Sequence, residues 1–299
     1  MKLVNECKKL NLNDFYALLQ DTLAKCMEES IHVGDLEISD FELLLKDESD
    51  IEVETLPYEL PLPALFSNKN GEMRKDCYGY PMYPLYKNLA AVMSDWLRTS
   101  RCPRENMPPV GPFVDEPNFI STLKVTCREV LELLKGLESL WDSWNNEERI
   151  GRMMLILSIL KKRGILSLLG LRKTVGSVDI WPPLAKTLIT SFDRPISTTV
   201  PLSEGARAIS KHFLRDETSK FWGSCKGNEM QKTKESHQKI IDVLNNAVWI
   251  NIHELPGHLP VIEVRESQGY GARWLADGSE FRGLLEPHMV DGHEVGWKH

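Results

Sequence analysis

Residues 270–286 read YGARWLADGSEFRGLLE and decide the fold of the C-terminal part of the chain. The dipeptide Asp277-Gly278 lies between two β-like runs, and it is a strong signal for a two-residue type I′ turn. Residues 248–253 (VWINIH) alternate with a period of two, which predicts a strand whose aliphatic side faces the core. With a further strand expected at 261–265, the end of the chain is predicted to form a small antiparallel β-meander.

The predicted turn also sets the register of the hairpin. Trp274 would lie opposite Phe281 on the core side, and Arg273 would lie directly opposite Arg282 on the other side. Two arginines at paired positions repel each other unless a negative group lies between or over them. A ligand phosphate or carboxylate would fit the two guanidinium groups. The internal alternatives are three carboxylates of the same region: Glu263, Glu280 and Glu286.

The rest of the chain has the periodicity of helices, interrupted by proline-rich stretches. The expected helical segments are about 13–29, 85–98, 120–141, 147–163, 165–171, 183–192, 203–216 and 228–247. The sequence therefore predicts an α+β fold, a predominantly helical body with a small C-terminal antiparallel β-meander. Residues 1–100 would form an N-terminal helical region with acidic and proline-rich segments. Residues 101–299 would hold the helical core and the β-unit, which could be one continuous domain.

Composition indicates a soluble globular protein. The chain has 299 residues, of which 42% are hydrophobic and 26% charged, which is typical of a packed domain. Its 6 cysteines form no CxxC pair, so we expect free thiols, a reducing compartment and a cytoplasmic location. The N-terminus does not resemble a secretion signal, and the longest apolar run, 153–160, is too short to span a membrane.

Negative charge is concentrated in one part of the chain. The formal net charge is −7, yet the segment 31–60 alone holds ten acidic residues and one lysine, so the remainder is slightly positive. This balance disfavours nucleic acid as a partner, although RNA stays open. Within the expected helix at 203–216, Arg207, Lys211 and Arg215 form a basic stripe, which is either a solvated face or an anion-binding surface.

Histidines are concentrated near the C-terminus, with five of the 8 in the last 47 residues. His253 shares a strand face with Asn251 beside the basic hairpin, where it could act as a general acid or base or be satisfied by its neighbours. His293, with Asp291 nearby, is a second candidate for proton transfer. The histidine spacing of five residues fits neither a helical nor a strand metal pair, so no metal site is predicted.

Several strings in the last third of the chain resemble a known signature. They are GARAISKH, AVWINIHELP, GYGARW, FRGLLEP and DGHEVGWKH. The strings are similar to the C-terminal signature of a family of uncharacterised eukaryotic proteins, and the resemblance covers about 203–299. It implies that the C-terminal tail belongs to the fold, and it implies no activity.

The function that these residues favour is binding of a small anionic ligand bearing phosphate or carboxylate, and His-mediated acid/base catalysis is left open. The ligand-binding residues would be Arg273, Arg282, Arg207, Lys211 and Asn251. The alternative is a non-catalytic protein-interaction protein that uses the acidic segment 35–59. A third hypothesis is RNA or tRNA contact through the basic stripe and exposed tryptophans. The sequence names no cofactor and no oligomeric state.

Overall fold

A computed structural model describes residues 8–48, 55–58, 60, 79–105, 107–111, 113–213, 220–223, 226–254 and 259–287. The chain divides into two compact units. The first comprises Met1–Asp50, Tyr83–Met107 and Glu116–Leu169, and the second comprises Ile51–Met82, Pro108–Asp115 and Gly170–His299. The division near residue 100 that the sequence favoured stays a prediction.

The first unit is helical in its described residues. Its helices are α1 (Leu12–Glu28), α2 (Ile38–Leu45), α3 (Leu85–Thr99), α4 (Pro117–Leu140) and α5 (Asn146–Leu168). Helix α1 begins at a capping box in which the Asn11 side chain accepts from the Asp14 backbone N–H and the Asp14 side chain accepts in return. The apolar stripe of α1 packs against α2, α3 and α5.

Two features of this unit differ from the sequence prediction. Helix α2 lies in the acidic stretch and was not expected, because its carboxylates obscure a short apolar face. Asp40 of α2 is buried and pairs with Lys162 at 3.0 Å, which offsets the cost of burying the charge. The segments 147–163 and 165–171 merge into the single helix α5, which departs from helical backbone angles at Lys161.

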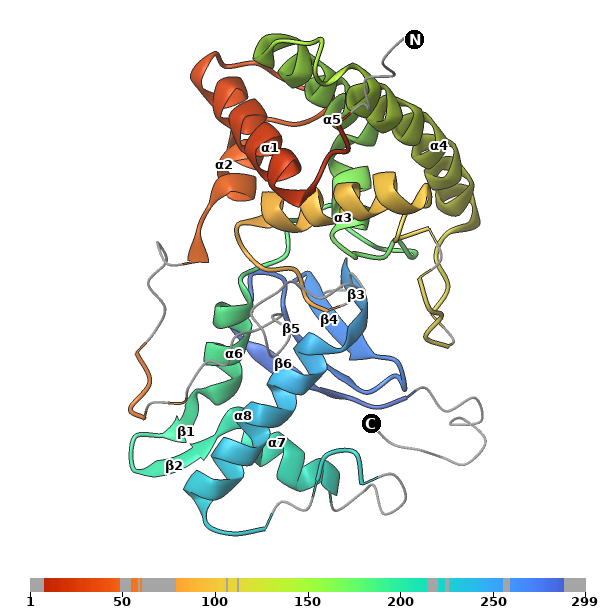
Figure 1. The fold of residues 1–299 in the computed structure, drawn as a ribbon. Helices are drawn as coiled ribbons and strands as arrows, with labels where there is room; N and C mark the ends of the chain where they lie inside the picture. Colours follow the sequence, from red (N-terminus) through yellow and green to blue (C-terminus); the bar gives the residue numbers. More distant parts are fainter. Residues whose placement is uncertain are drawn as a thin grey trace. The chain divides into compact units, whose positions relative to one another are not determined.

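The second unit holds the β-meander. Its elements are α6 (Ala185–Asp193), β1 (Pro195–Ser197), β2 (Val200–Ser203), α7 (Glu204–Phe213), α8 (Glu229–Asn245), β3 (Ala247–His253), β4 (Val261–Glu266), β5 (Gly271–Leu275) and β6 (Phe281–Leu285). Strands β3 to β6 form one antiparallel sheet in sequence order, drawn in blue in Figure 1. The predicted α+β fold with a C-terminal meander is therefore confirmed, while the short β1–β2 hairpin was not expected.

One face of this sheet is apolar and packs against helices. Helix α8 packs against β4 and β5, and α6 and α7 pack against β6. Trp274 is fully buried and donates its indole N–H to the Leu188 carbonyl of α6 at 3.0 Å. Trp274 pairs with Phe281, as predicted, and Phe281 meets Phe192 of α6 edge to face at 4.9 Å. This face forms the core of the second unit.

The register at the arginines is a correction. Arg273 pairs with Gly283, and Arg282 is the extra residue of a β-bulge, so the two guanidinium groups do not face each other. The turn is longer than predicted, because Gly278 donates to the Leu275 carbonyl and has positive φ, whereas Asp277 does not. The Asp277 carboxylate instead accepts the Ser279 backbone N–H at 2.9 Å, as in an Asx turn.

The described part of the chain holds helices of 8 to 24 residues. None of the helices there combines the length and the apolar character that crossing a bilayer requires.

Candidate functional site

A row of paired residues crosses the face of the sheet opposite the helices. Asn251 pairs with Glu263, Glu263 with Arg273, and Arg273 with Gly283. Directly paired residues of an antiparallel sheet point to the same side, so these four residues, here called the polar row, line one face. The polar row lies on the face opposite α6, α7 and α8 and is the candidate site.

Glu263 is the centre of this arrangement. Its side chain is 3% exposed, and Oε1 accepts from Nε and Nη2 of Arg273 at 2.8 and 2.5 Å. Oε1 also lies 3.3 Å from Nε2 of His253, and Oε2 lies 3.4 Å from Nη2 of Arg265. One carboxylate therefore orients one histidine and two arginines, and it is the internal counter-ion that the sequence left as an alternative.

These contacts decide the ionisation of Glu263. Burial by itself raises the pKa of this carboxyl group, but the hydrogen bond with His253 and the charges of Arg273 and Arg265 outweigh it and lower the pKa to about 2. Burial in turn lowers the pKa of Arg265, although Glu263 opposes this shift. Glu263 is thus a carboxylate at neutral pH, which makes it a better orienting group than a proton donor.

The polar row is accessible at the β5–β6 side. The Arg273 side chain of β5 is 33% exposed, whereas that of His253, at the end of β3 and beside the polar row, is 16% exposed. Gly283, opposite Arg273, has a φ of 146°, and a Cβ placed on it would meet none of the described atoms within 4 Å. Among the described residues, the backbone of Gly283 therefore leaves space beside the Arg273 guanidinium.

Asn251 is held by a segment that runs along the edge of β3. The Arg172 N–H donates to the Ile250 carbonyl at 2.7 Å, and the Val178 N–H donates to the Ile252 carbonyl at 2.9 Å. The amide of Asn251 accepts from Ser177 Oγ at 2.8 Å and donates to Thr174 Oγ1 at 2.7 Å. Asn251 is 1% exposed, so its polar atoms support β3 and its edge segment.

The other residues singled out in the sequence lie elsewhere. Arg282 is exposed on its bulge and pairs with Glu280 at 2.7 Å. Arg207 and Lys211 are exposed on α7, which packs against α8 and β6. His293 and Asp291 lie outside the described residues. The structure thus brings His253, Asn251 and Arg273 together.

Sequence reasoning missed Arg265, and it considered Glu263 only as an internal counter-ion and not as a site residue. Both lie in the run VIEVRE (261–266), in which two ionisable residues stand at a period of two inside a strand that is buried throughout. Charged residues are almost never fully buried unless they are paired. That alternation within an otherwise apolar strand was the signal that could have identified them.

Two further histidine–carboxylate pairs lie in the second unit. His212 Nδ1 of α7 lies 2.6 Å from Glu286 Oε1, and His237 Nδ1 of α8 lies 2.5 Å from Asp193 Oδ2. Burial raises the pKa of Asp193, although His237 opposes the shift. Both pairs belong to helices that pack against the sheet or against each other, away from the polar row. Across the described residues, no group of three or more His, Cys, Asp and Glu side chains is placed to hold a metal ion.

Comparison with known proteins identifies one related domain. Residues 194–286 match the family model described as the CdiA C-terminal tRNase toxin domain. The matched part begins directly after α6 and ends one residue after β6, so it includes the whole β3–β6 sheet. No curated protein and no solved structure matches the chain.

This match corrects two expectations. The resemblance to an uncharacterised eukaryotic family was wrong, because the same region matches a domain described as a tRNase toxin. The expectation against nucleic acid was wrong as well. The net charge of −7 is dominated by the acidic segment 31–60, which lies outside the matched residues, and it says little about the domain itself. A tRNA is anionic and bears phosphate, as predicted for the ligand, but it is not the small molecule that was expected.

Proposed function

We propose that residues 194–286 form a ribonuclease domain that cleaves a phosphodiester bond of tRNA, with His253, Glu263 and Arg273 in its active site. One observation carries the proposal. The residues that match a tRNase domain contain a sheet whose face opposite α6, α7 and α8 presents an oriented histidine beside a partly exposed arginine. Cleavage of a phosphodiester bond uses cations that bind the phosphate and a group that accepts or donates a proton.

The reaction can be written with the groups that this face holds. The ribose 2′-oxygen attacks the adjacent phosphorus, the bond from phosphorus to the 5′-oxygen breaks, and the products are a 2′,3′-cyclic phosphate and a 5′-hydroxyl. His253 takes the proton of the 2′-hydroxyl. Its Nε2 faces Glu263, so Nδ1 is the nitrogen that exchanges the proton, and the Glu263 carboxylate stabilises the imidazolium that forms.

Arg273 is assigned to the phosphate. Its Nε and Nη2 are held by Glu263, which leaves the outer edge of the guanidinium to donate to a phosphate oxygen above Gly283. This contact stabilises the negative charge that grows on the phosphate oxygens in the transition state. Glu263 touches no substrate in this scheme and is a positioning residue for both His253 and Arg273.

The remaining predicted cations take supporting roles in the proposal. The leaving 5′-oxygen takes its proton from water; His293 and Asp291, the other predicted proton-transfer residues, lie outside both the described residues and the matched residues 194–286. Arg282, Arg207 and Lys211 are exposed cations suited to phosphates further along the RNA backbone.

The test is cleavage of a tRNA pool by the full chain, followed on denaturing gels and by the chemistry of the new ends. His253→Ala is expected to lower kcat/KM by about 10²- to 10⁴-fold, and Arg273→Ala by about 10²-fold or more. His212→Ala is the matched control, since His212 also contacts a carboxylate but lies on the helix side, and it should change cleavage by no more than about threefold. Undiminished cleavage by His253→Ala, or no cleavage by the wild type, would exclude this site.

The non-catalytic alternative, in which the acidic segment 35–59 binds a basic partner, has less support. Two carboxylates of that segment are used within the first unit, since Asp35 accepts the Lys162 backbone N–H and Asp40 pairs with the Lys162 side chain. The alternative predicts partner capture that depends on the segment together with no cleavage of tRNA.

A further inference from the structure

A loop outside the matched residues packs against the face of the sheet that carries the polar row. Its described residues are 108–111 and 113–115, here called the cover loop, and they belong to the second unit. The Phe113 N–H donates to the Val110 carbonyl at 2.9 Å, and this turn places both side chains against Trp249. The Phe113 ring lies 5.0 Å from the Trp249 ring and 4.5 Å from the Arg265 guanidinium carbon.

Two buried N–H donors lie on the side chains that the cover loop packs against. Trp249 Nε1 and Arg265 Nε are buried and have no hydrogen-bond partner in the part of the chain that the structure describes. The two residues are 2% and 5% exposed. A buried donor without a partner destabilises the folded state, and valine and phenylalanine side chains cannot accept a hydrogen bond. The cover loop therefore stacks well on Arg265 and Trp249 but offers no acceptor to these two N–H donors.

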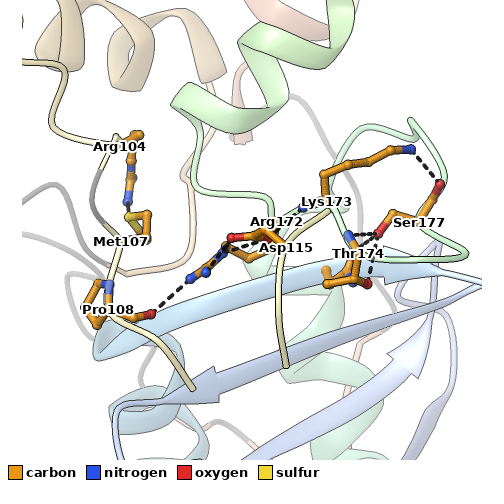
Figure 2. A network of polar contacts seen from close by, with 9 residues as sticks. Arg104, Met107, Pro108, Asp115, Arg172, Lys173, Thr174 and Ser177 are labelled. Atoms are coloured by element: carbon orange, nitrogen blue, oxygen red, sulfur yellow. Dashed lines mark hydrogen bonds and ion pairs between the residues drawn. The ribbon is translucent and has the colours of Figure 1, made fainter. Parts of the chain in front are cut away.

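The cover loop is held at its two ends by one residue. Figure 2 shows Arg172 reaching Asp115 and the Pro108 carbonyl. Arg172 Nη2 and Nε lie 2.6 and 2.8 Å from Asp115 Oδ2, and Nη1 donates to the Pro108 carbonyl at 3.0 Å. The Asp115 carboxylate also accepts the Lys173 backbone N–H at 3.2 Å. Its ends are thus fixed by this polar latch, and its middle is held by a small apolar contact with Trp249.

We propose that the corner formed by Arg265 and Trp249 is a nucleotide subsite of the proposed ribonuclease, and that the cover loop occupies it until RNA displaces Phe113. The proposal rests on the proposed function. A nucleobase offers the same flat face as Phe113 for stacking on Arg265 and Trp249, and it also carries carbonyl and ring-nitrogen acceptors for the two free donors. Arg265 also contacts Glu263, so the subsite adjoins the reacting centre.

This subsite specifies the kind of nucleotide it takes. A base can lie flat on protein side chains only when it is not stacked and paired inside a double helix. The subsite therefore selects an unpaired nucleotide next to the scissile bond, and duplex regions of a tRNA are poor substrates.

The experiment measures binding of a short fluorescein-labelled single-stranded RNA, 2′-O-methylated so that it cannot be cleaved, to the full chain by fluorescence anisotropy. Phe113→Ala removes the ring that occupies the subsite, and Asp115→Ala removes the latch. Both are expected to lower Kd by about tenfold, with no gain for the same RNA as a duplex. Val114→Ala is the matched control, because Val114 is 74% exposed on the same loop, and its Kd should stay at the wild-type value.

A double variant tests the free donors directly. Trp249→Phe keeps an aromatic ring but lacks the indole N–H, so adding it to Phe113→Ala should cancel most of the tenfold gain. Unchanged or weaker binding by Phe113→Ala and Asp115→Ala overturns the subsite. If Phe113→Ala shows no cooperative thermal unfolding, the Kd of Asp115→Ala decides, since that variant keeps the Phe113 side chain.

The two proposals fail separately. Tighter RNA binding by the cover-loop variants without any tRNA cleavage would contradict the proposed ribonuclease activity and support the nucleotide subsite. Cleavage of tRNA by the wild type, with unchanged Kd and kcat/KM in both cover-loop variants, would support the ribonuclease activity and contradict the subsite.

Discussion

Both faces of the β3–β6 sheet are buried, but one is built from apolar side chains and the other from ionisable ones. On the helix side, Trp274 and Phe281 pack against α6, and the one polar atom of Trp274 has a partner in the Leu188 carbonyl. On the other side, Glu263 and Arg265 are nearly as buried, yet each is ionisable and depends on the other for compensation. Buried ion pairs contribute little net stability, so a face built from them is better explained by what it binds than by folding.

The largest expected effect is on the free energy of unfolding and comes from a substitution in the apolar face. Trp274→Ala would remove a fully buried indole and leave the Leu188 carbonyl without its donor, which should lower the free energy of unfolding by about 4 kcal/mol. Urea denaturation of the full chain measures this loss. Trp274→Phe keeps most of the volume and should lose clearly less. Equal losses for the two variants would show that the helix side is not close-packed around this ring.

The next largest effect is the pH-dependent contribution of Glu263, on the polar face, to stability. Because the folded-state pKa of Glu263, about 2, lies below its ordinary value of 4.5, the ionised form stabilises the fold fully above about pH 4.5, and this contribution is lost as the pH falls toward 2. Glu263→Gln should therefore cost about 3 kcal/mol at neutral pH.

The pH profile separates this charge effect from packing. The stability difference between wild type and Glu263→Gln, measured by urea denaturation, should shrink steadily between pH 4.5 and about 2. The difference for Trp274→Ala should show no such titration, because no ionisable group is removed. A pH-independent loss in Glu263→Gln would mean that the carboxylate acts through shape alone.

The same contrast explains what could be predicted from the sequence. The pairing of Trp274 with Phe281 followed from alternation, because the core face of a hairpin is set by local pattern. The register at Arg273 did not, because Arg282 is the extra residue of a β-bulge just beyond the Trp274–Phe281 pair, and alternation does not reveal where a strand bulges.

The candidate site was predicted in part for a related reason. His253, Asn251 and Arg273 were identified because they stand on strand faces that periodicity assigns. Their contacts come from elsewhere: Thr174 and Ser177 bind Asn251 across more than seventy positions of sequence, and Phe113 meets Arg265 from still further away. Periodicity carries no information about such distant contacts, so neither the edge segment nor the cover loop was expected.

The smallest expected effect is on stability and concerns Arg282, which the sequence predicted to pair with Arg273. Arg282 is 45% exposed and bonds the similarly exposed Glu280, so Arg282→Ala should change the free energy of unfolding by less than about 0.5 kcal/mol. If it meets only the RNA backbone, its loss should weaken RNA binding a few-fold and reduce the salt dependence of Kd by about one charge. Arg273→Ala should instead act mainly on kcat, because its guanidinium is fixed by Glu263 beside the reacting phosphate. Equal effects of both substitutions on kcat would contradict the separation of the two residues by the bulge, and would place Arg282 at the reacting centre after all.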